Sequence, residues 1–221
     1  MPIRTIKAEE ITQVVKELCI GANLELPSDV ACSLCTMREK ESDPLAASVL
    51  DTLLANAQTA RRERIPICQD TGMAVFFVEL GQDVHIEGAT LQEAFDRGVA
   101  DGYRDGYLRC SVVRDPLRRV NTEDNTPAIL HITIVPGDRL AITAAPKGFG
   151  SENMSAIRMF NPTVTKEEIV SFVVDTVKRA GGNPCPPMVI GVGLGGDFEQ
   201  CAILAKRALT LPCLLYTSRC V

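Results

Sequence analysis

The chain has 221 residues, of which 46% are hydrophobic and 23% are charged, and its formal net charge is −5. These values are typical of a globular protein with a sizeable core, and the length suits one large domain or two small ones. An acidic chain has no general attraction for nucleic acid or an anionic membrane, so we expect neither as a partner. The sequence shows neither a run of the roughly 20 apolar residues that span a bilayer nor a signal peptide. Together with the nine cysteines, this favours the reducing cytoplasm, where cysteines serve as thiols or metal ligands.

The N-terminal part of the chain is predicted to be helical. Apolar residues recur at helical spacing over 11–19, which predicts an amphipathic helix ending near Gly21. Pro27 and Pro44 occupy positions typical of the first turn of a helix, and Ser and Asp at 42–43 can cap the second of these helices. The expected buried stripe of that helix is Val49, Leu50, Leu53, Leu54 and Ala57.

Strands are predicted in the middle of the chain and near its end. The run over 73–80 is continuously apolar and rich in Val and Phe, which favours a buried strand. The segments 128–135 and 139–145 are joined by Pro136-Gly137-Asp138, and we expect them to form an antiparallel hairpin. A further short strand is predicted over 188–192.

Capping boxes mark the starts of two more helices. Thr90-x-x-Glu93 opens a helix to about residue 101, and Thr165-x-x-Glu168 opens one that Gly181 can end. The glycine-rich segment 147–153 is expected to be an irregular turn, and a last helix is predicted over 198–209. The order of elements predicts an α+β fold, in which N-terminal helices precede a mixed or antiparallel sheet packed with helices.

Two cysteine motifs have the composition of a functional site. The segment 66–72 places the thiol of Cys68, the amide of Gln69 and the carboxylate of Asp70 side by side, and its final glycine permits a tight turn. Cys185 has prolines on both sides, which fix its backbone and favour an exposed position. Exposed thiols on rigid turns suit metal ligands better than core positions. The pattern therefore indicates a thiolate-bound metal centre with a carboxylate beside it.

A purely structural interpretation of segment 66–72 also stays open at this point. The segment can be a proline-led turn whose cysteine packs against its neighbours. Gln69 and Asp70 are costly to bury without partners, which favours a cleft lined by polar groups.

The other cysteines and histidines favour structural roles. Cys32-x-x-Cys35 has the spacing of a redox or zinc half-site, but on a helix this spacing puts both thiols on one face, as core positions would be. We expect small buried or half-buried side chains at Cys19, Cys110 and Cys201, and satisfied strand histidines at His85 and His131.

The segment 191–196 opens an alternative from a different class, a nucleotide-binding module. It satisfies the pattern Gly-x-Gly-x-x-Gly between a predicted strand and a predicted helix, where glycines can bring a pyrophosphate to a helix N-terminus. Two features oppose this interpretation: no strand opens the chain as in a dinucleotide fold, and no acidic residue ends a following strand.

Several further motifs occur in the order typical of one enzyme family. They are Pro66–Gly72, Leu108-Arg109, and the segments 113–117, 121–128, 147–155, 183–187 and 191–196. With these motifs the chain resembles the iron–sulfur hydro-lyases of the class I fumarase and L-tartrate dehydratase family, specifically the alpha subunit of the two-subunit form. The resemblance runs from the first helices to about Leu211, and the stretch 150–155 is more similar to fumarase.

The resemblance implies a [4Fe–4S] cluster that is held by three cysteines and keeps one iron open to substrate oxygen atoms. Cys68 and Cys185 match the first two ligands, whereas the third belongs to a later segment that this sequence does not contain. The implied reaction is the reversible hydration of fumarate to L-malate. The nearest alternative is dehydration of L-tartrate or a related hydroxydicarboxylate.

Roles for individual residues follow from the same resemblance. Asp70 matches the carboxylate that transfers a proton. Gln69 is expected to hydrogen-bond the substrate, and Arg109 is expected to pair with a carboxylate. Gly150 matches a position whose backbone N–H contacts substrate, and Lys147 adds positive charge nearby.

The family's site is shared between two domains, so the resemblance also implies a beta subunit, and hence a hetero-oligomer. Residues 1–211 are expected to form the alpha-subunit domain, truncated at its C-terminal side. Residues 212–221, with Cys213 and Cys220, are unassigned, a foreign tail being one interpretation. A structural assembly subunit is the remaining alternative, should truncation have removed the site.

Overall fold

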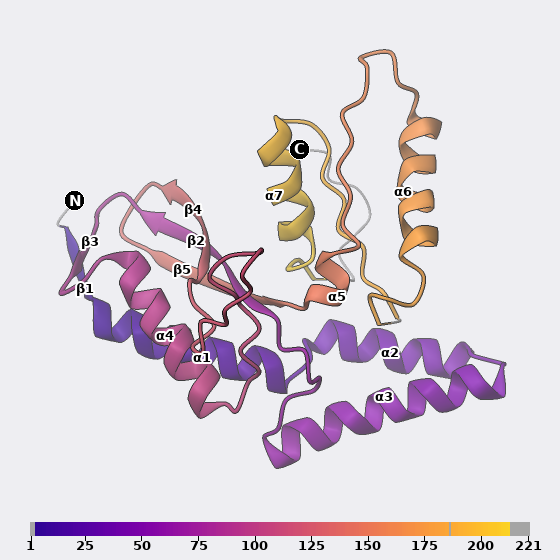
Figure 1. The fold of residues 1–221 in the computed structure, drawn as a ribbon, viewed down its shortest axis with the longest axis horizontal. Helices are drawn as coiled ribbons and strands as arrows, with labels where there is room; N and C mark the ends of the chain where they lie inside the picture. The colour runs from indigo at the N-terminus through magenta and orange to yellow at the C-terminus, as the bar shows by residue number, and fades with distance from the viewer. Residues whose placement is uncertain (1–2, 186, 213–221) are drawn as a thin grey trace. The chain divides into compact units, whose positions relative to one another are not determined.

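The computed structural model describes residues 3–185 and 187–212 (Figure 1). The chain divides into two compact units: unit 1 holds the described residues up to Pro146 together with Pro212, and unit 2 runs from Lys147 to Leu211. Helices and short strands are both present, which confirms the predicted α+β class. None of the described helices combines the length and apolar composition that crossing a membrane requires.

Unit 1 is built around the packing of helix α1 (Ala8–Leu24) on helix α4 (Leu91–Asp105). Gly98 and Gly102 lie one turn apart on α4, where the two helices meet. A Cβ added at Gly98 would lie 2.6 Å from the Cβ of Val15, and one added at Gly102 would lie 2.9 Å from a side chain of α1. The two glycines therefore let the helix backbones approach more closely than any larger residue would allow.

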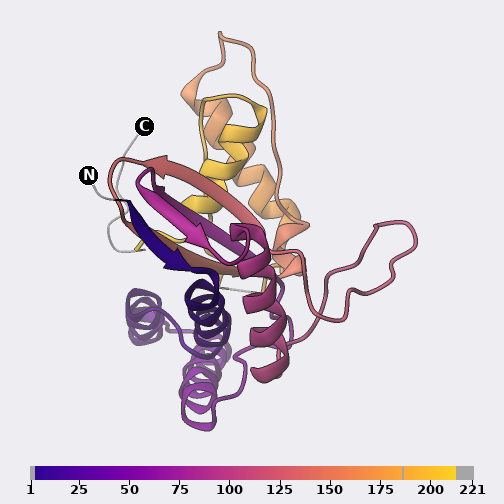
Figure 2. The same cartoon turned by 90° about the vertical axis from the view of Figure 1, so that its left-hand side faces the viewer.

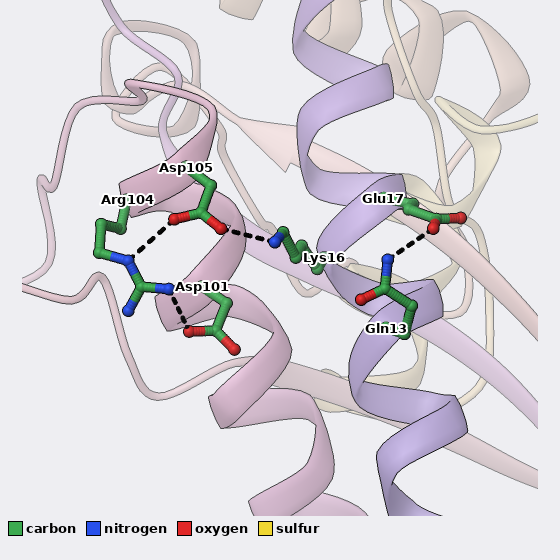
Figure 3. Close-up of polar contacts among 6 residues, drawn as sticks. All are labelled: Gln13, Lys16, Glu17, Asp101, Arg104 and Asp105. Carbon is green, nitrogen blue, oxygen red and sulfur yellow. Dashed lines mark hydrogen bonds and ion pairs between the residues drawn. The ribbon is translucent and has the colours of Figure 1, made fainter.

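Charged side chains cover the solvent side of this helix pair (Figure 3). Lys16 of α1 forms an ion pair with Asp105 of α4 at 2.5 Å, and Arg104 pairs with Asp101 at 2.7 Å. Water screens such exposed pairs, so they add little stability. The free energy that holds α1 on α4 comes mainly from the buried side chains beneath them.

Both helices run about one turn beyond their predicted ends. In α1 the N–H of Glu25 still donates to the carbonyl of Gly21 at 3.0 Å, so Gly21 lies inside the last turn and the helix ends at Leu24. The predicted capping box at the start of α4 is confirmed, because the side chains of Thr90 and Glu93 each bond the other's backbone N–H.

A three-stranded sheet packs against α1 and α4 (Figure 2). Its middle strand is β2 (Met73–Gly81), which pairs in parallel with β4 (Ile129–Val135) on one side and has β5 (Leu140–Lys147) on the other. The prediction of a buried strand over 73–80 is confirmed. Phe76 of β2 contacts Phe95 of α4 edge to face, with ring centroids 5.0 Å apart.

The predicted hairpin between β4 and β5 is wrong, because β2 lies between these two strands. Their connection passes around the end of β2: the N–H of Gln82 donates to Val135 at 2.9 Å, and the N–H of Gly81 donates to Arg139 at 2.8 Å. The passage is tight, since a Cβ on Gly81 would lie 2.3 Å from the carbonyl oxygen of Gly137. A turn signal indicates that the chain reverses, but it does not report which strand occupies the space between.

Four further elements complete unit 1. Strand β1 (Arg4–Lys7) pairs in parallel with β3 (Val84–Glu87), and β1 is not evident from the apolar pattern. Helices α2 (Ser28–Lys40) and α3 (Pro44–Glu63) pack on each other.

The start of α3 agrees with the sequence analysis, and its buried face agrees in part. The carboxylate of Asp43 accepts the N–H of Ala46 at 2.9 Å, so Asp43 is the cap. Leu50 is buried as predicted, whereas Val49 is exposed. The buried face of α3 contains Ala47 and Leu50, which are three positions apart, and Val49 lies outside this face. The stripe is therefore rotated slightly from its predicted position.

Unit 2 contains helices α5 (Phe149–Glu152), α6 (Lys166–Ala180) and α7 (Phe198–Ala208). The predicted capping box and glycine stop of α6 are confirmed, as is α7. Two predictions are wrong: the expected irregular turn at 147–153 contains α5, and residues 188–192 form no strand. Residues 188–192 do not pair with another strand, and Gly191 packs directly against the backbone of α7.

Candidate substrate pocket and metal centre

The segment that carries Cys68 is anchored by two helices. The N–H of Ile67 donates to the carbonyl of Asn23 of α1 at 2.9 Å, and the side-chain amide of Asn56 of α3 donates to the carbonyl of Ile67 at 2.8 Å. These bonds hold the chain at the residue before Cys68. The cysteine therefore emerges from a fixed point.

The turn at 68–72 directs backbone donors at the two side chains of chemical interest. The N–H of Asp70 points at the sulfur of Cys68 from 3.4 Å, and the N–H of Gly72 donates to the Asp70 carboxylate at 3.1 Å. Gly72 has a φ of 65°, which a glycine adopts without strain. Cys68 is exposed and is not part of a disulfide, so its sulfur is accessible at this turn.

Arg109 is brought to this turn by the hydroxyl of Thr71. The N–H of Arg109 donates to the Thr71 Oγ1 at 3.0 Å, and this hydroxyl donates to the Arg109 carbonyl at 3.2 Å. Six residues line an open pocket of about 480 Å³: Pro66, Cys68, Gln69, Thr71, Tyr107 and Arg109. Three residues predicted to bind a metal or a substrate thus line one pocket, with Asp70 in the same turn.

A buried hydrogen-bond network behind the pocket was not predicted. The Tyr103 hydroxyl lies 3.1 Å from the carbonyls of both Thr71 and Gly72, and the Asn125 side chain donates to Gly72 at 3.0 Å. The Asn125 Oδ1 also accepts the N–H of Ser111 at 2.8 Å. Burial raises the pKa of Tyr103, which therefore remains a protonated donor.

The one sequence feature that could have indicated the structural role of Asn125 is that it is an asparagine. It is fully buried and has a φ of 60°, a left-handed conformation that Asn tolerates better than most residues. A buried amide needs several partners, so such a residue joins segments rather than filling space.

Unit 2 places two other predicted site residues on neighbouring segments. Gly150 of α5 lies against the chain at Asn183, since a Cβ on Gly150 would lie 3.1 Å from the Asn183 carbonyl oxygen. Cys185, two residues further on, is exposed, has a φ of 58°, and donates its N–H to Gly182 at 3.2 Å. A left-handed cysteine in a tight turn presents its thiol outward, as predicted from the flanking prolines.

Lys147 belongs to a charge cluster in unit 2. The Glu152 carboxylate lies 2.6 Å from the Nζ of Lys206 and 3.5 Å from that of Lys147. Lys147 also hydrogen-bonds the hydroxyl of Ser151 at 2.5 Å. Partial burial would raise the pKa of Glu152, but the hydrogen bond and charge of Lys206, with the charge of Lys147, outweigh burial and lower it. Glu152 and Lys206 were not singled out by sequence analysis.

The glycines of segment 191–196 have a packing explanation. A Cβ on Gly191 would lie 2.1 Å from the carbonyl oxygen of Ala205, and one on Gly193 would lie 2.1 Å from that of Cys201. These two carbonyls are one turn apart on α7, so the glycines let the segment lie directly on the helix backbone. At the start of α7 the side chain of Asp197 already accepts a helix N–H. The glycines of the Gly-x-Gly-x-x-Gly pattern therefore serve the close packing of this segment on α7. The segment also lacks the preceding strand that a dinucleotide-binding site has.

The remaining cysteines and histidines show one error of prediction. Cys32 and Cys35 lie on α2 but are exposed, so the core stripe expected there is wrong: the face they share is turned to solvent. Burial raises the pKa of Cys19 to about 12, as expected of a core thiol. Cys110 and Cys201 are half-buried as predicted. His131 stacks on Phe77, and Cys213 and Cys220 lie outside the described residues.

Comparison with known proteins supports the family resemblance that the sequence motifs indicate. Residues 12–216 match the family described as fumarate hydratase (Fumerase). The chain is 36% identical over 206 residues to "Putative L(+)-tartrate dehydratase subunit alpha" of Methanocaldococcus jannaschii, an alignment that covers 90% of the chain and 72% of that relative. It is 27% identical over 207 residues to the L(+)-tartrate dehydratase subunit alpha of Escherichia coli K12, covering 92% and 68%. The chain therefore belongs to the hydro-lyase family of class I fumarases and L-tartrate dehydratase alpha subunits.

Proposed function

We propose that this chain is the alpha subunit of an iron–sulfur fumarate hydratase, which hydrates fumarate reversibly to L-malate. The observation that carries the proposal is the pocket in unit 1, which Cys68, Gln69 and Arg109 line together. A dicarboxylate requires a cation and hydrogen-bond donors, and a thiol beside them suits a soft metal. The family of the chain provides the reaction class.

Cys68 and Cys185 are the proposed cluster ligands. Both are exposed thiols without a disulfide, and thiolates are the ligands that hold iron–sulfur clusters in proteins. A [4Fe–4S] cluster would supply an open iron, a Lewis acid that polarises a carbon–oxygen bond. Within residues 3–185 and 187–212 no three His, Cys, Asp or Glu side chains are grouped to hold a metal ion.

The other residues would bind the substrate and move its proton. Arg109 would hold one carboxylate with its planar guanidinium, while Gln69 donates a hydrogen bond beside it. The Asp70 carboxylate would take the proton from the carbon next to a carboxylate during dehydration and return it during hydration. The backbone N–H of Gly150 would contribute a further donor from unit 2.

A second candidate substrate is L-tartrate or a related hydroxydicarboxylate. It is favoured by the names of the relatives, which are L(+)-tartrate dehydratase alpha subunits. Fumarate, malate and tartrate are all four-carbon dicarboxylates, so Arg109 and Gln69 can bind any of them. The discrimination rests on whether the site satisfies the additional hydroxyl of tartrate.

A beta subunit is the proposed partner. The relatives are named as alpha subunits, and this chain, with a net charge of −5, is poorly suited to hold a dianion by itself. The partner would supply the further cations. We expect the isolated chain to be a poor catalyst even when it is loaded with iron and sulfide.

The first test is anaerobic reconstitution with iron and sulfide in the presence of the second subunit. Wild type is compared with Cys68→Ser and Cys185→Ser, and with Cys32→Ser as a matched exposed thiol on α2. The first two variants are expected to lose the cluster absorbance and at least about 100-fold in activity, as for removal of a group essential to the chemistry. Cys32→Ser is expected to behave as wild type. An intact cluster in Cys68→Ser would refute the assignment.

The substrate is decided by steady-state kinetics on the same preparation. The kcat/KM values for fumarate, L-malate and L-tartrate are compared, because specificity is the ratio of these constants. A higher value for L-tartrate would replace the fumarase proposal by the second candidate. Turnover of none of them would overturn both.

A further inference from the structure

The backbone of Arg109 is fixed to the Cys68 turn by a single side chain. Thr71 is 3% exposed, and its hydroxyl both accepts the N–H and donates to the carbonyl of Arg109. This exchange of two hydrogen bonds resembles the pairing between two strands, except that a side chain takes the place of one backbone. It closes a loop between residues that are 38 positions apart in the chain.

Thr71 is itself held from behind. Its carbonyl is 3.1 Å from the Tyr103 hydroxyl of α4, and the next carbonyl, that of Gly72, accepts from Asn125 at 3.0 Å. A buried network whose donors and acceptors are all hydrogen-bonded is held in a single geometry. The Thr71 hydroxyl therefore has little freedom to move. The guanidinium of Arg109, in contrast, is at the end of a long exposed side chain.

We propose that Thr71 is a positioning residue, whose hydroxyl sets the place of Arg109 relative to the turn of Cys68, Gln69 and Asp70. The inference rests on the proposed function, since it assigns Arg109 a substrate carboxylate. Without the hydroxyl the partly buried Arg109 N–H loses its acceptor, and the backbone shifts to find another. A shift of about 1 Å in a binding group suffices to weaken productive binding.

Three variants separate this role from a general effect on folding. Thr71→Val keeps the shape and removes the hydroxyl, and Thr71→Ser keeps the hydroxyl and removes a methyl. Thr12→Val is the matched control, because the Thr12 hydroxyl also bridges two segments, contacting the carbonyls of Ala8 and Ala94 at 3.0 Å each. It lies between α1 and α4 and does not line the pocket.

The experiment is steady-state kinetics of the assembled, cluster-loaded enzyme with the substrate that it turns over best. Thr71→Val is expected to raise KM about tenfold, with kcat changed less than about threefold, because a ground-state carboxylate contact is displaced. Thr71→Ser is expected to restore the KM of wild type to within about twofold. Thr12→Val should lower the melting temperature without raising KM. Equal KM values for Thr71→Val and Thr71→Ser, or an equal rise in Thr12→Val, would overturn the inference.

A second measurement keeps the inference separate from the proposed function, should wild type show no turnover. Phenylglyoxal modification of Arg109 is followed by mass spectrometry with and without succinate, an unreactive dicarboxylate. Protection in wild type and Thr71→Ser but not in Thr71→Val would support the positioning role. Equal protection in all three proteins, or none in wild type, would contradict it.

Discussion

Units 1 and 2 differ in how they are held together. Unit 1 buries the side chains of α1, α4 and β2 in one core, whereas among the described residues of unit 2 Ala180 is the one buried apolar residue. Unit 2 also leaves many apolar side chains near half exposure, among them Val189, Ile190, Val192, Leu194 and Phe198. Burial is the main source of stability, so the two units are expected to open with different free energies.

This difference bears on the predicted site residues, some of which lie in unit 1 and others in unit 2. In unit 1 the Cys68 turn and Arg109 rest on buried partners, Tyr103 and Asn125. In unit 2 the groups near Gly150 depend on short turns and on the charge cluster of Glu152. We therefore expect the predicted site residues of unit 1 to be preorganised and those of unit 2 to depend on local polar contacts.

The largest expected effect comes from crowding the core of unit 1. Gly98→Ala would place a methyl group 2.7 Å from the carbonyl of Thr12, a backbone atom that cannot yield, so we expect a loss of about 1–3 kcal/mol in the free energy of unfolding. Gly21→Ala is the control, because an added Cβ there would meet nothing within 4 Å apart from its chain neighbours and the nearby backbone of its own helix. It is expected to stabilise α1 by about 0.5–1 kcal/mol. Denaturant unfolding measures both, and a neutral Gly98→Ala would refute the close helix packing.

The next effect concerns the charge cluster of unit 2. Lys206→Met removes the nearer partner of Glu152, and we expect hydrogen exchange of α5 and α7 to report a loss of about 1–2 kcal/mol at pH 7. Lys178→Met, an exposed position on α6, is the control. Unit 1 should be unaffected by either change. Faster exchange in α1 and α4 as well would show that the units are not independent.

The same variant has a predicted pH dependence. Because the folded state lowers the pKa of Glu152 from 4.5, the ionised carboxylate contributes stability above that value. This contribution is lost as the pH falls through the lower pKa of the folded state. The difference between wild type and Lys206→Met should therefore be present at pH 7 and shrink in acid. A constant difference would assign the role of Lys206 to packing.

The smallest expected effect is that of Tyr103→Phe in unit 1. The variant removes one buried hydroxyl, but Gly72 keeps its bond from Asn125, so we expect a loss of about 1 kcal/mol in the free energy of unfolding. Because burial raises the pKa of Tyr103, the loss should be the same at pH 6 and pH 8. A cost much above that of Gly98→Ala would make the network, rather than the helix packing, the main support of unit 1.

Prediction from the sequence was most accurate where structure depends on neighbouring residues. The caps at Asp43, Thr90 and Thr165 were found because a cap is a contact over three positions. Prediction was least accurate for the order of the strands in the sheet and for residues 188–192, which were expected to form a strand. In both cases the partner, β2 or α7, is distant in the sequence.

The same distinction between local and long-range contacts applies to the candidate site. The sequence by itself determined which residues carry chemistry, since the thiol of Cys68, the amide of Gln69 and the guanidinium of Arg109 are recognisable as functional groups. Only the tertiary structure decided that they surround one pocket, and that Thr71, Tyr103 and Asn125 hold it. The physical reason is that side-chain chemistry belongs to a residue, whereas a buried hydrogen bond belongs to two segments that only folding brings together.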